Sequence, residues 1–161
     1  MRTAMWLRGV VVIVLGFLAP AAWGADVPFD YVICGSEKYT AIDTRVPGVQ
    51  AIGVEGWKII ASSTTKELQN ATQHCIGYWR AVEGKEVSRG VCKTTDLDGN
   101  VWISEWEQTA PGEGTFVFLS GTGKFKGIKG SGRWKNVGRG TPITEGTGLI
   151  CIRDTGTYTV P

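Results

Sequence analysis

Short runs of β-branched and aromatic residues, separated by glycine, dominate the chain after its first 24 residues. No long segment keeps the period of an amphipathic helix, and only 62–72 could hold a helical turn, around 65–70. The runs predict eight strands, over 31–35, 49–62, 73–82, 86–95, 101–109, 114–120, 132–137 and 149–153. A further short strand is possible at 158–160. Eight strands joined by short turns predict an all-β protein, either an antiparallel sandwich or a closed barrel.

The start of the chain has a different pattern. A basic beginning with Arg2 and Arg8 is followed by an apolar run of about ten residues and by small residues up to Gly24. These three parts are typical of a secretory signal peptide, and the apolar run is too short to span a bilayer. We therefore expect a signal peptide over 1–24, with cleavage after Ala25 as the weaker alternative. The remaining 25–161 would form a single β-barrel domain, secreted or periplasmic, with no membrane span after cleavage.

Cleavage would also change the charge of the protein. The full chain has 17 Lys and Arg residues against 15 Asp and Glu residues. Removing Arg2 and Arg8 leaves 15 of each sign, so the mature chain has a formal net charge of zero. A neutral chain has no global electrostatic attraction to nucleic acid.

The four cysteines all follow the predicted cleavage site, and an even number in an exported chain predicts two disulfides. A two-residue turn at Glu83-Gly84 places Cys75 directly opposite Cys92, which predicts a disulfide between them. Cys34 and Cys151 then pair by elimination, joining the first and last strong strands and closing the barrel. The sequence contains no C-x-x-C motif, and the single histidine points away from Cys75, so no metal and no cofactor is expected.

A second turn signal, Asp98-Gly99, is typical of a two-residue type I′ hairpin. Pairing across this turn places Thr95 opposite Trp102 and Val91 opposite Trp106. Combined with the first turn, this register divides three strands into two faces, neither of them plainly hydrophobic. One face would carry Cys75, Trp79, Ser88, Cys92, Glu105 and Glu107. The other would carry His74, Ile76, Tyr78, Arg80, Arg89, Val91, Lys93, Trp102, Ser104 and Trp106.

Aromatic side chains together with a few polar groups are what a small-molecule cavity in a β-barrel requires. The second face has this mixture, and we expect it to bind a small apolar or aromatic ligand. A packed barrel core or a subunit interface of a homo-oligomer is the alternative. The sequence shows no set of residues that we assign as catalytic, so a binding role is favoured over an enzyme. The predicted ligand-binding residues are His74, Tyr78, Arg80, Lys93, Trp102 and Trp106.

One cluster of basic residues contains no acid between its members, and Phe125 and Trp134 are interleaved with it. Such a cluster could contact a polyanion such as nucleic acid, a glycan or anionic lipid. Lysines on an edge hairpin also prevent aggregation between sheet edges, which is the more common explanation. The members are Lys124, Lys126, Lys129, Arg133, Lys135 and Arg139.

The segment Ser120-Gly-Thr-Gly-Lys-Phe125, followed by Gly127 and Gly130, resembles the strand–turn–strand signature of the allene oxide cyclase and dirigent proteins and of their small exported bacterial relatives. The resemblance implies a single antiparallel eight-stranded β-barrel, a cavity-forming architecture like that of the lipocalins. It places no catalytic residue of those families on this chain.

Three functions follow from these observations. The favoured one is an exported binding module with an aromatic-lined cavity. The alternatives are an envelope structural or interaction protein that uses its outer surface, and a cyclase or coupling-directing enzyme on the same barrel. Fold alone does not choose among them.

Overall fold

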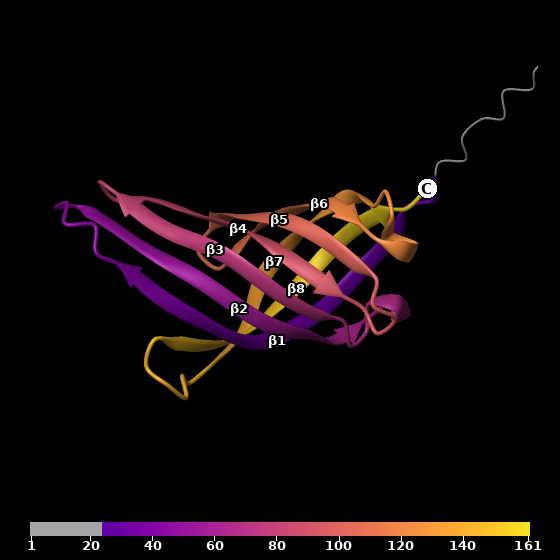
Figure 1. Cartoon of the computed structure of the whole chain (residues 1–161), viewed down its shortest axis with the longest axis horizontal. Helices are drawn as coiled ribbons and strands as arrows, with labels where there is room; N and C mark the ends of the chain where they lie inside the picture. The colour runs from indigo at the N-terminus through magenta and orange to yellow at the C-terminus, as the bar shows by residue number, and fades with distance from the viewer. Residues whose placement is uncertain (1–23) are drawn as a thin grey trace, which may run out of the picture.

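The computed structural model describes residues 24–161, which form one antiparallel sheet closed into a barrel (Figure 1). Each strand pairs with the next, and the last pairs with the first, so the predicted eight-stranded barrel is confirmed. The predicted signal peptide falls outside the described residues, apart from Gly24. No helix within the described residues is long and apolar enough to cross a membrane. The strands are β1 (Val27–Ile42), β2 (Val49–Ser63), β3 (Thr72–Val82), β4 (Lys85–Thr95), β5 (Val101–Ala110), β6 (Glu113–Gly121), β7 (Lys129–Gly140) and β8 (Thr147–Thr159).

A hydrophobic plug fills one end of the barrel, near the C-terminus in Figure 1. Two short 3-10 turns, η1 (Lys66–Leu68) and η2 (Gly123–Phe125), insert Leu68 and Phe125 into this end, where both side chains are buried. The ring of Phe125 meets Trp102 edge-on, with ring centroids 4.7 Å apart. The remaining buried members of the plug are Phe29, Tyr31, Ile33, Ile60, Ala71, Phe116, Ile128 and Tyr158.

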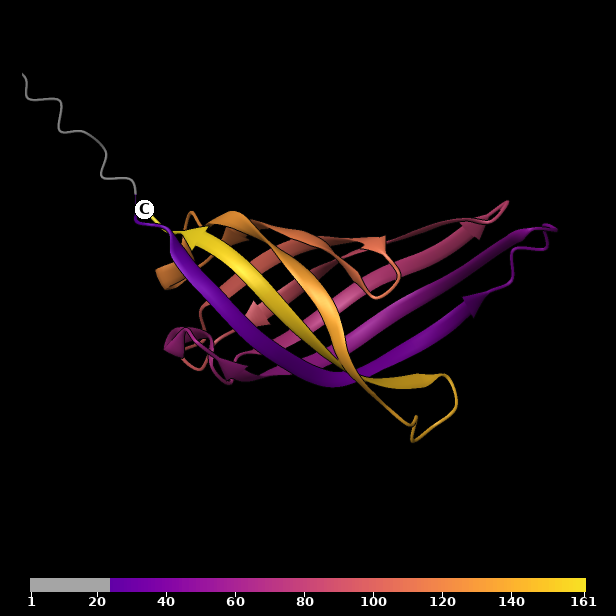
Figure 2. The same cartoon turned by 180° about the vertical axis from the view of Figure 1, so that it is seen from behind.

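Both predicted disulfides are confirmed. Glu83 and Gly84 adopt positive φ angles of 50° and 77°, as a two-residue type I′ turn requires, and Cys75 lies opposite Cys92 in the resulting register. Cys34 pairs with Cys151 across the β1–β8 junction that closes the barrel. Figure 2 shows this side, where β1, β8 and β7 run next to one another.

The predicted register between β4 and β5 is wrong by one residue. Thr95 pairs with Val101, and Val91 pairs with Glu105 rather than with Trp106. The turn has three residues instead of two: the Asp96 N–H donates to the Asn100 carbonyl, and the Gly99 N–H donates to the Asp96 carbonyl. Gly99, at φ 81°, supplies the left-handed residue that follows a type I turn in such a loop.

The side chain of Asp96 explains why the longer turn forms. Its Oδ1 atom accepts hydrogen bonds from the backbone N–H groups of Asp98 and Asn100, at 2.9 and 2.8 Å. The ammonium of Lys124 lies 2.8 Å from its Oδ2 atom, and these contacts hold the pKa of Asp96 below its usual range despite burial. A shift of one residue reverses every side chain of β5. Trp102, Ser104 and Trp106 therefore share the inner face with Cys75, whereas Glu105 and Glu107 face outward.

Candidate functional site

A cavity of about 420 Å³ lies inside the barrel, between the plug and the opposite, open end. Inward-facing residues of all eight strands line it, and Tyr31, Ile33 and Phe116 of the plug form its floor. Arg139, an exposed residue of β7, reaches the cavity from the open end. Cavities of this size hold small organic molecules in other proteins.

Three tryptophans form much of the cavity wall, Trp79 from β3, Trp106 from β5 and Trp134 from β7. The indoles of Trp106 and Trp134 meet edge-to-face, with centroids 6.1 Å apart and planes at 89°. Trp106 lies against Gly77 and Gly90, where an added Cβ atom would come within 2.6 and 2.8 Å of its ring. The two glycines thus make the space in which this indole lies flat against the wall.

A buried ion pair on the cavity wall joins the neighbouring strands β1 and β2. The Lys58 ammonium lies 2.9 Å from Glu37 Oε1, with side chains only 4% and 13% exposed. The Tyr39 hydroxyl donates to the other carboxylate oxygen of Glu37 at 2.8 Å. Burial and this carboxylate raise the pKa of Tyr39 to about 12, so the phenol keeps its proton. Both oxygens of Glu37 therefore have partners.

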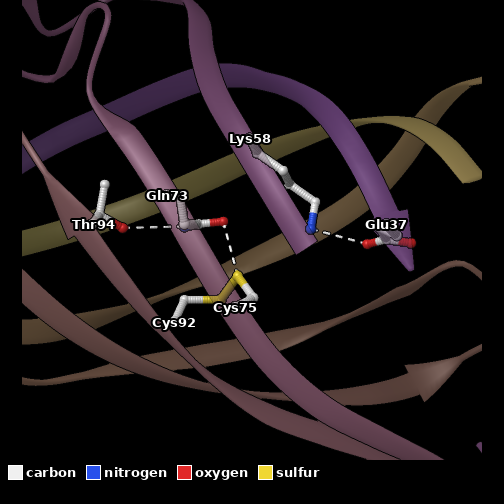
Figure 3. The surroundings of a disulfide bond; sticks show 6 residues. All are labelled: Glu37, Lys58, Gln73, Cys75, Cys92 and Thr94. Atoms are coloured by element: carbon white, nitrogen blue, oxygen red, sulfur yellow. Dashed lines mark hydrogen bonds and ion pairs between the residues drawn. A yellow bond between two sulfur atoms is a disulfide. The ribbon is translucent and has the colours of Figure 1, made fainter. Parts of the chain in front are cut away.

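The inner disulfide forms part of the same wall (Figure 3). Gln73 lies above it, with Oε1 3.2 Å from Cys75 Sγ, while its amide nitrogen donates to Thr94 Oγ1 at 3.2 Å. The covalent bond and the fixed amide hold β3 and β4 in register beside the Lys58–Glu37 pair. In this part of the cavity the side chains of Gln73, Lys58 and Glu37 already have polar partners.

Asp154 is different, because its carboxyl group is buried without a full set of partners. The residue is 7% exposed on β8, and among the described residues its Oδ1 atom has no hydrogen-bond partner. Burial raises the pKa of Asp154 to about 7, against the opposing effects of the Tyr31 hydroxyl and the Lys58 charge. The carboxyl can therefore hold or release a proton near neutral pH.

A second acceptor lies on the adjacent strand. Asn136 of β7 lines the cavity, and its Oδ1 atom likewise finds no partner within residues 24–161. Trp134, two residues earlier, is the cross-strand neighbour of Asp154, so both free oxygens belong to the same part of the inner face. A buried oxygen without a donor is costly, and a bound molecule with hydroxyl or N–H groups would satisfy it.

The structure does not bring the six predicted ligand-binding residues together. Trp106 lines the cavity, and Trp102 is buried in the plug. His74, Tyr78, Arg80 and Lys93 lie on the outer wall, on the side of β3 and β4 opposite to the inward-facing Cys75 and Cys92. The changed register of β5 places the tryptophans on the inner face instead. The predicted common face is therefore wrong, and a binding role for each of the six residues, Trp106 included, stays a prediction.

On the outer wall, His74 contacts two neighbouring side chains of β2. Its Nε2 atom lies 2.9 Å from Glu55 Oε1, and its ring stacks on Trp57 at 5.5 Å. His74 and Lys93 line an open depression that also reaches the Cys34–Cys151 disulfide. These contacts explain the histidine without a catalytic role.

The six basic residues that the sequence grouped into one cluster also lie in different places in the structure. Lys124 pairs with Asp96 and Asp98, and Arg139 reaches the cavity. Phe125 belongs to the plug and Trp134 to the cavity wall, so neither aromatic accompanies the basic residues outside. The remaining four, Lys126, Lys129, Arg133 and Lys135, are exposed.

Sequence reasoning missed most of the cavity. Asp154, Lys58 and Glu37 are isolated charges in strands, which commonly face solvent. In β1 the residues Tyr31, Ile33, Glu37 and Tyr39 fall on one face, a mixture that a polar barrel interior shares with a solvated strand. Only the closed barrel shows that this face is the inner one.

Comparison with known proteins supports the architecture. No protein-family model and no curated protein matches the sequence. Among the solved structures that share the fold are those of the pterocarpan synthase dirigent proteins GePTS1 and PsPTS1. The first has a TM-score of 0.55 at 9% identity and covers 88% of this chain and 89% of its own. The second has a TM-score of 0.52 at 10% identity, with 84% and 94% covered. The chain thus has a dirigent-like barrel fold, in agreement with the resemblance of the segment 120–132.

Proposed function

We propose that this barrel binds a small, largely aromatic molecule in its inner cavity. The observation that carries the proposal is the combination of three indoles with the unpartnered Oδ1 atom of buried Asp154. Flat apolar walls favour an aromatic ligand, and the free acceptor favours a ligand with a hydroxyl or N–H group at its inner end. Arg139 at the open end suits a polar or anionic outer end.

Binding of 2-naphthol, measured through the quenching of tryptophan fluorescence, tests this proposal. Ser104→Phe and Ser88→Leu each add apolar volume to the cavity, because both serines are buried in its wall. We expect roughly tenfold weaker binding in each variant, a loss of about 1.4 kcal/mol. Val91→Phe adds the same ring on the outer face of β4 and should leave binding unchanged. Equal affinity in all four proteins would reject the cavity as the site.

An enzyme of the cyclase or coupling-directing type is the second candidate. Both similar structures are named as synthases, and the pKa of about 7 suits Asp154 to exchange a proton with a bound molecule. A binding module would release its natural ligand unchanged, whereas an enzyme would convert an added excess of it. If conversion occurs, Asp154→Asn should abolish it while binding is retained.

Export is also part of the proposal. The described residues contain two disulfides and no free cysteine, a pattern that persists in oxidising compartments. Expression of the full chain with N-terminal sequencing of the exported product tests it. We expect the product to begin at Ala25, and retention of Met1 in a reduced, cytoplasmic protein would contradict it.

A further inference from the structure

The outer face of β7 carries cations that the barrel itself does not explain. Lys129, Arg133 and Lys135 alternate with inward residues such as Trp134, so they project from the same outer face. Lys126 precedes them, just after η2. Within residues 24–161 none of these four takes part in an ion pair, in contrast to Lys124 and Arg153.

Protection of a sheet edge, the usual reason for such lysines, does not explain Arg133 and Lys135. β7 pairs with β8 along its length, and Ser131 to Lys135 pair with β6 on the other side. A closed barrel has no edge at which another chain could add. Cations at these positions need a different explanation.

The neighbours of these residues are mostly uncharged. Arg133 lies between Thr115 and Thr155, and Lys129 lies opposite Thr159. Lys135 is flanked by Glu113 on β6 and by Arg153 on β8, and Arg153 is already paired with Asp30. Glu113 is thus the one acid at these cross-strand positions, against four unpaired cations. The face is positive although the mature chain would be neutral.

We propose that this face, formed by Lys126, Lys129, Arg133 and Lys135 with the surrounding hydroxyl side chains, binds an acidic polysaccharide. The cations match carboxylate or sulfate groups, and Thr115, Thr155 and Ser131 can hydrogen-bond to sugar hydroxyls. Single-stranded nucleic acid fits less well, because it requires aromatic stacking. The aromatics nearest in sequence, Phe125 and Trp134, face inward.

Affinity for heparin, used as a soluble sulfated probe, tests the proposal on the mature protein. We expect binding that weakens steeply with salt, because each neutralised charge releases counterions. Arg133→Gln combined with Lys135→Gln should bind roughly tenfold more weakly at 0.1 M salt. Lys38→Gln combined with Lys85→Gln removes the same charge from exposed sites on β1 and β4 and should have little effect.

Three results would overturn the proposal: absence of salt-dependent binding, equal losses in the two double variants, or tighter binding to duplex DNA or anionic vesicles than to heparin. Polygalacturonate and neutral dextran serve as parallel probes, and binding to the first but not the second supports recognition of acidic sugars. Because these substitutions lie outside the cavity, binding of 2-naphthol should remain normal in both double variants.

Discussion

Replacing Asp154 with asparagine should remove a pH dependence of stability that the buried carboxyl creates. The pKa of Asp154 rises from 3.8 to about 7 on folding, mainly because burial disfavours the charged form. Between these values the folded protein retains a proton that the unfolded chain releases, so stability falls as the pH rises. Each pKa unit corresponds to 1.36 kcal/mol, which gives a loss of about 4 kcal/mol from pH 4 to pH 8. About 3 kcal/mol of this loss falls above pH 5.

Urea unfolding followed by circular dichroism, at pH values from 4 to 8, measures this effect. Asparagine resembles the protonated carboxyl and does not ionise, so the variant should lack the contribution. The free energy of unfolding of the wild type minus that of Asp154→Asn should fall by about 4 kcal/mol over the series. All other ionisable groups are present in both proteins, so their contributions largely cancel in this difference.

Asp30→Asn provides a control of opposite sign. Its hydrogen bond with Arg153 lowers the pKa of Asp30, so this carboxylate stabilises the fold above its unfolded pKa of 3.8 and loses that effect as the pH falls further. The difference between wild type and Asp30→Asn should be flat between pH 5 and pH 8. A flat difference for Asp154→Asn over the same range would refute the claim that this carboxyl is buried without compensating partners.

Three further predictions concern the frame of the barrel and its interior. Replacing Cys34 and Cys151 by serine should cost about 5 kcal/mol, and replacing Cys75 and Cys92 about 3 kcal/mol, because the first bridge joins residues 117 apart and the second residues 17 apart. Urea unfolding without reductant measures both losses, and a larger effect of the inner pair would contradict the ranking. Phe125→Ala should destabilise by about 3–5 kcal/mol, since the ring is 2% exposed in the plug, whereas a loss below 1 kcal/mol would show that the plug is loosely packed. Gly90→Val should displace the Trp106 ring, and unchanged near-ultraviolet circular dichroism would contradict that contact.

The sequence was sufficient to predict the eight strands because strand periodicity and turn chemistry are local, whereas the choice of a barrel over a sandwich came from the resemblance of the segment 120–132. Glycine-marked turns and β-branched runs located the eight strands, and Glu83-Gly84 gave the register that pairs Cys75 with Cys92. β1 was predicted only over 31–35 but spans Val27–Ile42. The predicted strand ended too early because polar residues such as Glu37 occupy later inward positions. An alternating pattern with Glu37 facing inward cannot be distinguished locally from a solvated strand.

The candidate site depended on information that the sequence does not carry. Asp98-Gly99 indicated a two-residue turn, but the Asp96 side chain stabilises a three-residue turn instead. That single residue exchanged the faces of β5 and separated Trp106 from His74 and Lys93. The environment of Asp154 is made by residues of β1, β2 and β7, which are distant from it in the sequence. Its burial and its raised pKa could therefore not be predicted without the fold. The charges inside the barrel could therefore be identified only from the three-dimensional structure.

Native mass spectrometry of the protein, purified after expression of the full chain, tests the central claim most directly. Spectra before and after denaturation report whether a small molecule is retained in the folded chain. We predict an additional mass that disappears on denaturation and is lost or strongly reduced in Ser104→Phe, while Val91→Phe retains it. A retained mass that Ser104→Phe leaves unchanged, or a bare chain that also fails to bind 2-naphthol, would contradict the account of the cavity as a binding site.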